Sequence, residues 1–118
     1  MKKPGNNFLL LCPLINNEIA WEEQQKKIDL KKQNKSLLDK FLQNFFRAPK
    51  TTRITLDEYG SAVWKMCDGR TKVMDIGRSL EEEFGDEIKP TYPRLVEFIK
   101  LLLNQELIKI HDAVKEEN

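Results

Sequence analysis

The stretch TLDEYGSAVWKMCDGRTKVMDIG, from Thr55 to Gly77, constrains the fold more than any other part of the chain. Its first four residues have the spacing of a capping box, which predicts a helix start after Thr55. Asp68-Gly69 predicts where that helix stops, because glycine adopts the left-handed conformation of a helix end at little cost. Thr71 then predicts the cap of a second helix. These signals predict a sharp corner between two short helices.

Three helices are predicted in this half of the chain, because apolar residues recur there at helical spacing. The second ends at Gly85, and the third begins at Thr91 with Pro93 tolerated in its first turn. Gly77 lies inside the second helix at a cost of roughly 1 kcal/mol relative to alanine, which indicates a close approach by another backbone. The apolar positions are Leu56, Tyr59, Val63 and Met66, then Val73, Ile76, Leu80 and Phe84, then Leu95, Phe98, Ile99, Leu102 and Leu103.

A small antiparallel sheet is predicted before the helices. Residues 18–22 and 27–31 alternate apolar and charged side chains around a polar turn near residues 24–27, as in a hairpin with one buried face. Its lysines are interpreted as a solvated face that pairs with glutamates of the neighbouring strand. The β-branched residues of 51–55 predict a third strand. Residues 8–15 are expected to be extended against the core, and residues 106–110 to form a brief final strand.

One more helix, inserted between the hairpin and the third strand, is predicted at residues 36–48, where Ser36 can cap a wide apolar stripe. At 118 residues the chain is expected to be a single domain over 1–118. Its parts would be an N-terminal segment and hairpin (8–35), the inserted helix (36–48), a winged-helix core (51–110) and a polar tail (111–118). The fold class is therefore predicted as α+β and winged-helix-like, with about three strands followed by a three-helix tripod.

The charge and cysteine content exclude several function classes. Twenty basic residues against nineteen acidic ones give a net charge of +1, without the basic excess typical of a nucleic-acid binder. Cys12 and Cys67 form no CxxC pair, and with the single histidine, His111, they cannot make a zinc site, so no metal or cofactor is expected. No histidine or lysine is spaced to complete a catalytic dyad, which predicts a protein that is not an enzyme. No stretch has the roughly 20 apolar residues of a membrane span, and we expect a cytoplasmic protein.

The segments LDEYGSAVWKMCDGRTKVMDIGRSLEEEFG and RLVEFIKLLLNQELI resemble the PqqD family, named for the pyrroloquinoline-quinone biosynthesis protein D. The resemblance covers residues 54–110. The chain departs from the family pattern in its inserted helix, in its N-terminal extension, and at Glu106, where a glycine is common. The matching positions are Leu56, Asp57, Gly60, Val63, Trp64, Asp68, Gly69, Thr71, Val73 and Ile76.

The resemblance implies a peptide-recognition element and no catalysis. The leader of a ribosomally synthesised precursor peptide would add as a strand to the sheet edge, and the protein would present it to a modifying enzyme, often a radical SAM enzyme. Arg53 on that edge either pairs with an acidic leader residue or is simply solvated. The peptide-binding residues would be Thr52, Arg53, Ile54 and Thr55 on the edge, and Leu95, Phe98, Ile99 and Leu102 as the groove wall.

Two other functions stay open from the sequence. A winged-helix DNA-binding protein would need basic residues on its recognition helix, but Arg94 and Lys100 stand beside Glu97, and Arg78 beside a run of glutamates. A scaffold that contacts a folded partner by the same edge would bind no leader. Replacing Ile54 with proline is expected to abolish leader binding.

Overall fold

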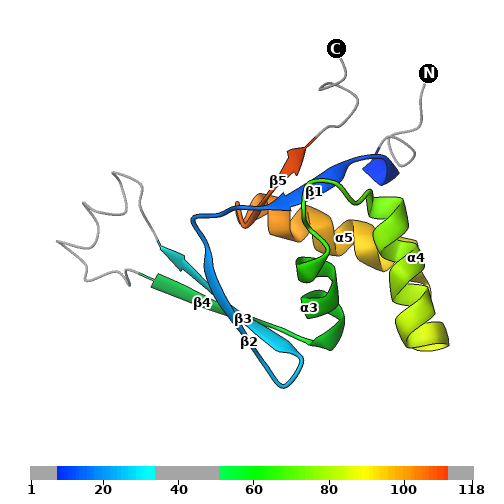
Figure 1. Cartoon of the computed structure of the whole chain (residues 1–118), viewed down its shortest axis with the longest axis horizontal. Helices are drawn as coiled ribbons and strands as arrows, with labels where there is room; N and C mark the ends of the chain where they lie inside the picture. Colours follow the sequence, from blue (N-terminus) through cyan, green and yellow to red (C-terminus); the bar gives the residue numbers. More distant parts are fainter. Residues whose placement is uncertain (1–7, 34–50, 112–118) are drawn as a thin grey trace, which may run out of the picture. The chain divides into compact units, whose positions relative to one another are not determined.

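The computed structural model describes residues 8–33 and 51–111. They belong to two compact units, one built from residues 1–16 and 59–118 and the other from residues 17–58 (Figure 1). The inserted helix predicted at residues 36–48 lies wholly outside the described residues. The expectation of one domain over the whole chain stays a prediction.

The unit of residues 17–58 contains a three-stranded antiparallel sheet. Its strands are β2 (Ala20–Gln24), β3 (Lys27–Gln33) and β4 (Thr51–Leu56), in the order β2-β3-β4. The predicted hairpin and third strand are thus confirmed. The turn between β2 and β3 is two residues long, and both Gln25 and Lys26 have positive φ, at 53° and 67°. This is the conformation of a type I′ turn, whose twist matches that of the strands.

The two faces of β3 differ in burial, as the alternation predicted, but β2 is exposed along its whole length. Trp21, predicted on the buried face of β2, is 42% exposed, so the prediction is wrong for this strand. Ile28 and Leu30 are fully buried, and Leu56 is nearly so. Asp29, which lies between Ile28 and Leu30 in the sequence, carries its charge on the opposite face. There the hydroxyl of Thr55 donates to the Asp29 carboxylate at 2.7 Å. Thr55 is therefore a strand residue that bonds across the sheet, and the prediction that it caps the first helix is wrong.

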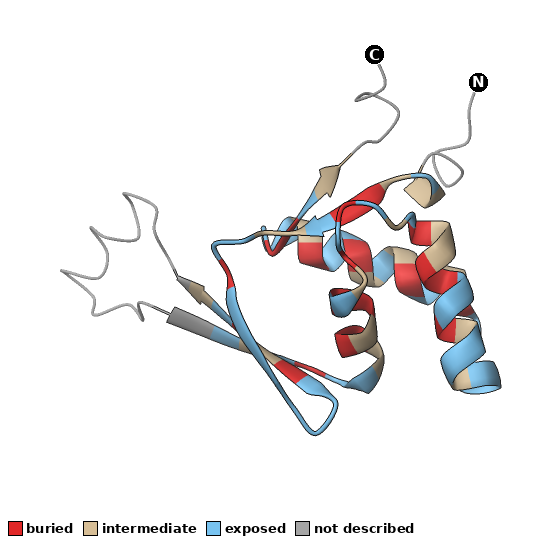
Figure 2. Ribbon diagram, viewed as in Figure 1, coloured by how far each residue is buried: buried red, intermediate tan, exposed pale blue. Residues whose placement is uncertain are grey.

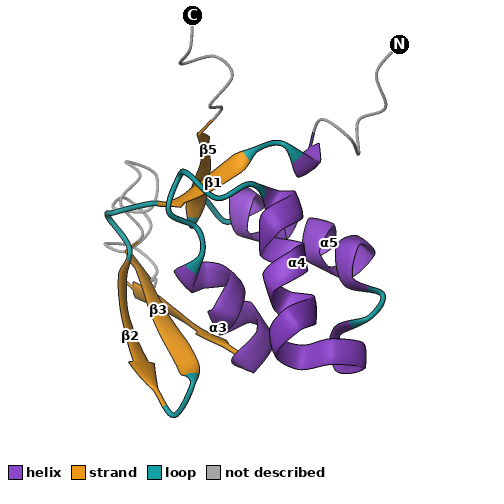
Figure 3. Ribbon diagram, turned by 45° about the vertical axis from the view of Figure 1, so that its right-hand side comes forward, coloured by secondary structure: helices purple, strands orange, loops and turns teal. Residues whose placement is uncertain are grey.

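The helices with bounds in the described part of the other unit are α3 (Glu58–Lys65), α4 (Val73–Phe84) and α5 (Thr91–Asn104), with a 3₁₀ turn, η1 (Gly85–Ile88), between the last two (Figure 3). With the three-stranded sheet they confirm the α+β class. Most of the apolar stripes predicted for α4 and α5 is buried, as the coloured ribbons show (Figure 2), whereas Phe84, Phe98 and Leu103 are half-buried. Trp64 of α3 is also fully buried, although its position in the sequence lies one residue off the predicted stripe.

The corner between α3 and α4 departs from the prediction in two respects. α3 ends at Lys65, and Gly69, predicted to stop this helix, donates its N–H to the carbonyl of Pro13 at 2.8 Å. The α4 helix begins at Val73, its N-cap is Lys72, and no side chain caps it. The Thr71 hydroxyl instead donates to the Asp68 carboxylate at 3.1 Å. Thr71 therefore stabilises the turn before the helix, and its prediction as the helix cap is wrong. Gly85 does end α4, with φ of 62° and its N–H donated to the carbonyl of Glu81.

A second, two-stranded sheet in this unit was predicted only as two separate segments. β1 (Cys12–Ile15) pairs antiparallel with β5 (Ile108–His111). On its other side β1 bonds the corner that follows α3, through Ile15 N–H to the carbonyl of Cys67 at 2.9 Å and Gly69 N–H to the carbonyl of Pro13 at 2.8 Å. β1 therefore lies between β5 and the Asp68-Gly69 corner.

The contact between α4 and α5 is made at Gly77. A Cβ at this position would lie 2.4 Å from Cε1 of Tyr92, whose hydroxyl donates to the Met74 carbonyl at 2.9 Å. The predicted close approach is confirmed, but the neighbour is an aromatic ring and not a backbone. Beside it the Thr91 hydroxyl donates to the Glu81 carboxylate at 2.6 Å.

Within residues 8–33 and 51–111, no helix is long and apolar enough to cross a membrane.

Gly77→Ala is expected to lower the free energy of unfolding by about 1–2 kcal/mol, because overpacking against Tyr92 outweighs the gain in helix propensity. Urea denaturation measures the change. In a Tyr92→Ala background the same substitution should be neutral or stabilising, because the ring is gone. Equal effects in both backgrounds would contradict the contact.

Glu106→Gly is expected to raise the free energy of unfolding by about 0.5–1 kcal/mol. Glu106 has φ of 61°, a left-handed conformation that costs an L-residue roughly 1–2 kcal/mol, partly offset by the greater unfolded-state freedom of glycine. Glu106→Ala is the matched control, since it removes the same charge and keeps the strained conformation. Thermal melting of both variants compares them, and a Gly variant no more stable than the Ala variant would contradict this account.

Candidate functional site

β4 is a terminal strand of its sheet. Its inner edge pairs with β3 from Ile28 opposite Leu56 to Gln33 opposite Thr51. Within the described ranges, 8–33 and 51–111, no strand pairs with its outer edge. A terminal strand leaves half of its backbone N–H and C=O groups available to another chain. The four edge residues predicted from the sequence, Thr52 to Thr55, all lie on β4.

The hairpin register decides which residues of β4 direct their backbone outward. In a two-residue hairpin the pair that flanks the turn, here Gln24 and Lys27, exchanges both hydrogen bonds. Bonded and non-bonded pairs then alternate, so the backbone groups of Ile28 and Leu30 are directed to β4. Their partners there are Leu56 and Ile54. The backbone groups of Arg53 and Thr55, between these partners, are therefore directed outward.

This alternation divides the four predicted edge residues into two kinds. Arg53 and Thr55 offer backbone groups to an added strand. Thr52 and Ile54 direct theirs inward to β3, opposite Lys32 and Leu30. A proline at Ile54 would remove a hydrogen bond of the sheet itself, so that substitution tests folding more than binding.

The four residues predicted as a groove wall lie on α5 and differ in burial. Leu95, Ile99 and Leu102 have at most 3% of their surface exposed. Phe98 is half-buried. Among these four, Phe98 is thus the residue with side-chain surface to offer a ligand, and the other three serve the core. Leu101, which was not predicted as a site residue, is 54% exposed on the same helix.

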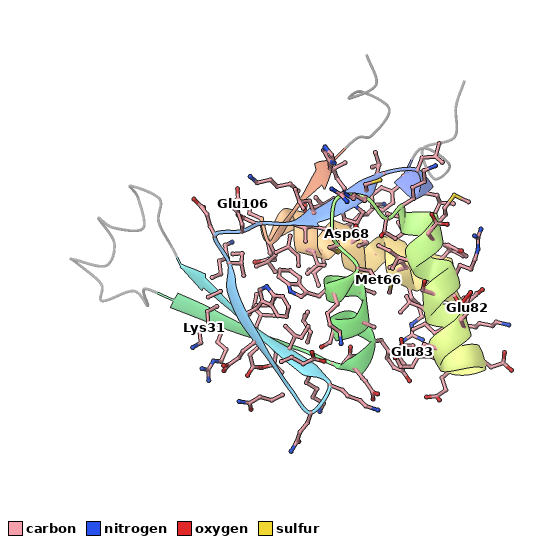
Figure 4. The ribbon with its side chains drawn as sticks, in the orientation of Figure 1. Lys31, Met66, Asp68, Glu82, Glu83 and Glu106 are labelled. Atoms are coloured by element: carbon pink, nitrogen blue, oxygen red, sulfur yellow. The ribbon has the colours of Figure 1, made fainter. Side chains whose placement is uncertain are left out.

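The Asp68 carboxylate accepts hydrogen bonds from both neighbouring residues that follow Gly69 in the corner after α3. Asp68 Oδ1 accepts from the N–H groups of Arg70 and Thr71, both at 2.8 Å. These bonds to the backbone lower the pKa of the Asp68 carboxyl, most strongly the one from Arg70. Gly69 has φ of 79° and a ring nitrogen of His111 lies 2.8 Å from its carbonyl oxygen. Figure 4 shows Asp68 in the loop that follows α3. The Asp68 carboxylate therefore stabilises the turn, and we assign the corner a structural role.

The two cysteines are not placed for catalysis. Neither Cys12 nor Cys67 is in a disulfide, and both are buried. Burial, with a smaller contribution from the charge of Asp68, raises the pKa of Cys67 to about 12. Its thiol therefore stays protonated and is a poor nucleophile. In the described part of the chain no group of three or more His, Cys, Asp or Glu residues could hold a metal ion.

The arginine that a DNA-binding helix would need is held by the protein. Arg94 Nη1 lies 3.4 Å from the carbonyl oxygens of Glu87 and Ile88, and its guanidinium lies 5.8 Å from the centre of the Tyr59 ring. Arg78 pairs with Asp75 at 3.5 Å. Arg94 and Arg78 thus have local partners, which disfavours a phosphate-binding helix.

Comparison with known proteins supports one family. The PqqD family model, described as coenzyme PQQ synthesis protein D, matches residues 48–108, more than half of the 118-residue chain. The match contains β4, the three helices and the Asp68-Gly69 corner. No curated protein and no solved structure matches the chain.

The Asp68 carboxylate is expected to make stability depend on acidity. Its pKa is lower in the fold than the ordinary value, so its contribution to the free energy of unfolding is present above that ordinary value and is lost as the pH falls through the folded pKa. Asp68→Asn keeps an oxygen acceptor but has no charge to lose. Urea denaturation between about pH 6 and pH 2 should therefore show a smaller acid loss for this variant than for the wild type.

Asp86→Asn is the matched control, because it removes an exposed carboxylate from η1 without touching the corner. Wild-type and Asp68→Asn profiles that run parallel over the acid range would contradict the role given to Asp68.

Proposed function

The chain belongs to the PqqD family, and we propose that it captures the leader of a ribosomally synthesised precursor peptide and presents it to a modifying enzyme. Family membership indicates a peptide-binding partner protein of such a pathway, and members of the family are non-catalytic accessory proteins. In this proposal the leader adds as a strand along the outer edge of β4. The modifying enzyme then acts on the presented peptide, and in this proposal it is often a radical SAM enzyme.

The observation that carries the proposal is the outer edge of β4 at Arg53 and Thr55, with which no strand of residues 8–33 and 51–111 pairs. Strand addition there satisfies the N–H and C=O of both residues, and each such bond contributes about 0.5–1.5 kcal/mol net. Ordering a flexible segment costs about 2–5 kcal/mol, so these bonds roughly balance it. Side-chain contacts must therefore decide the affinity, and a weak, micromolar complex is expected.

The helix residues named by the resemblance belong to the proposal with different roles. Phe98 has accessible surface and is proposed as a direct contact of the leader. Leu95, Ile99 and Leu102 are buried, and we assign them to the support of the helix. Substitutions at these three positions would change stability first and would report little about binding.

Arg53→Pro is expected to weaken leader binding about tenfold or more, because it removes an outward N–H and places a ring against the incoming strand. Arg53→Ala is the matched control, since it loses the same charge and keeps the N–H. The measurement is fluorescence anisotropy of a labelled leader peptide encoded beside the gene, titrated with each full-length variant. Unchanged urea midpoints show that the sheet is intact, as expected for proline at an edge position that makes no ladder bond.

Equal affinities for the two Arg53 variants would contradict strand addition at this edge. If no peptide binds and only a folded enzyme is retained on immobilised protein, the protein is a scaffold. Mobility shifts of DNA that weaken steeply with salt would instead support the winged-helix DNA-binding alternative.

A further inference from the structure

Two positively charged residues, Lys31 and Arg53, lie side by side on the exposed face of the three-stranded sheet and form what we call the positive row. The register places Lys31 of β3 directly opposite Arg53 of β4, and both side chains are exposed. On its other side Lys31 is opposite Ala20 of β2. Residues directly opposite on one face have Cβ atoms about 4.5–5.5 Å apart, so like charges there destabilise the pair. Within the sheet, neither cation has a carboxylate directly opposite it.

The acidic residues of this face lie in the neighbouring row. Glu22 is opposite Asp29, and Asp29 is opposite Thr55. They reach the positive row along diagonals of about 7–8 Å, or along β3 from Asp29 to Lys31 two residues on, and exposed charges interact weakly at such separations. The Asp29 carboxylate is also already bonded by the Thr55 hydroxyl at 2.7 Å. Within the sheet, the positive row is therefore only partly compensated by its neighbouring side chains.

An apolar row lies next to it on the opposite face. Trp21 is opposite Leu30, and Leu30 is opposite Ile54. Leu30 is fully buried, and Ile54, at the outer end of the row, is only half-buried. A strand added to β4 would place one residue opposite Arg53, on the positive row, and one opposite Ile54, on the apolar row. These two residues of the added strand are adjacent in its sequence, because Arg53 and Ile54 are adjacent in β4.

We infer that β4 selects a segment in which an acidic residue opposite Arg53 is adjacent in sequence to an apolar residue opposite Ile54. This inference rests on the proposed function and defines the chemistry of its ligand. The carboxylate supplies the directly opposite partner that Arg53 lacks within the sheet, and the apolar residue covers the accessible part of Ile54. Arg53 is thus a specificity-determining residue through its side chain as well as a binding residue through its backbone.

The test is selection from a random peptide display library on the full-length protein, which requires no knowledge of the natural leader. Peptides selected by the wild type, and lost on Arg53→Pro, should be enriched in Asp or Glu next to an apolar residue. Selection on Arg53→Glu should enrich Lys or Arg at the same position. Arg78→Glu on α4 is the matched control, because it changes the net charge equally at an exposed site in the other unit.

The affinities of the selected peptides complete the test. Replacing the acidic residue with glutamine should weaken binding to the wild type about three- to fivefold, and a lysine there should restore binding to Arg53→Glu. The preference should shrink as salt is raised from low to high concentration.

The outcomes separate this inference from the function on which it rests. Peptides that bind and are lost on Arg53→Pro, but show the same charge preference with wild type, Arg53→Glu and Arg78→Glu, overturn the inference and leave strand addition standing. A library that yields no peptide sensitive to Arg53→Pro overturns both.

Discussion

The alternation of hydrogen bonds in an antiparallel sheet is the constraint on which this account depends. Because the turn between β2 and β3 has two residues, every pair along the three strands is assigned as bonded or non-bonded. The assignment leaves Arg53 and Thr55 with outward backbone groups and gives Ile54 to the sheet. It also sets which side chains share a face, so one register determines both the backbone groups that a ligand can bond and the charges that it meets.

The helical unit depends on a different constraint, the corner between α3 and α4. The Asp68 carboxylate shapes this corner by accepting backbone N–H bonds, and its backbone neighbours bond β1. β1 in turn pairs with β5, so the two ends of the described chain are held beside the corner. An Asp-Gly motif within a family match can suggest a functional site, but here the Asp68 carboxylate and the Gly69 N–H form hydrogen bonds that stabilise the fold.

Much of the fold could be predicted from the sequence, because hydrophobic periodicity is a local property. The hairpin, β4, the three helices and the final strand were all expected near their observed positions. The pairing of β1 with β5 could not be predicted, since it joins segments almost a chain length apart. Thr55 and Thr71 have the chemistry of helix caps, and only tertiary structure shows that they bond carboxylates instead. The edge residues were predicted as a group, but their division into inward and outward backbones required the turn conformation at Gln25 and Lys26, which are neither glycine nor asparagine.

Amide hydrogen exchange at single-residue resolution tests the central claim most directly. In the free protein the N–H groups of Arg53 and Thr55 should exchange faster than that of Ile54, because only the last is bonded within the sheet. A bound leader peptide should slow exchange at Arg53 and Thr55 and leave Ile54 nearly unchanged. Slow exchange at Arg53 and Thr55 without peptide, or no protection there when peptide is bound, would contradict strand addition at β4.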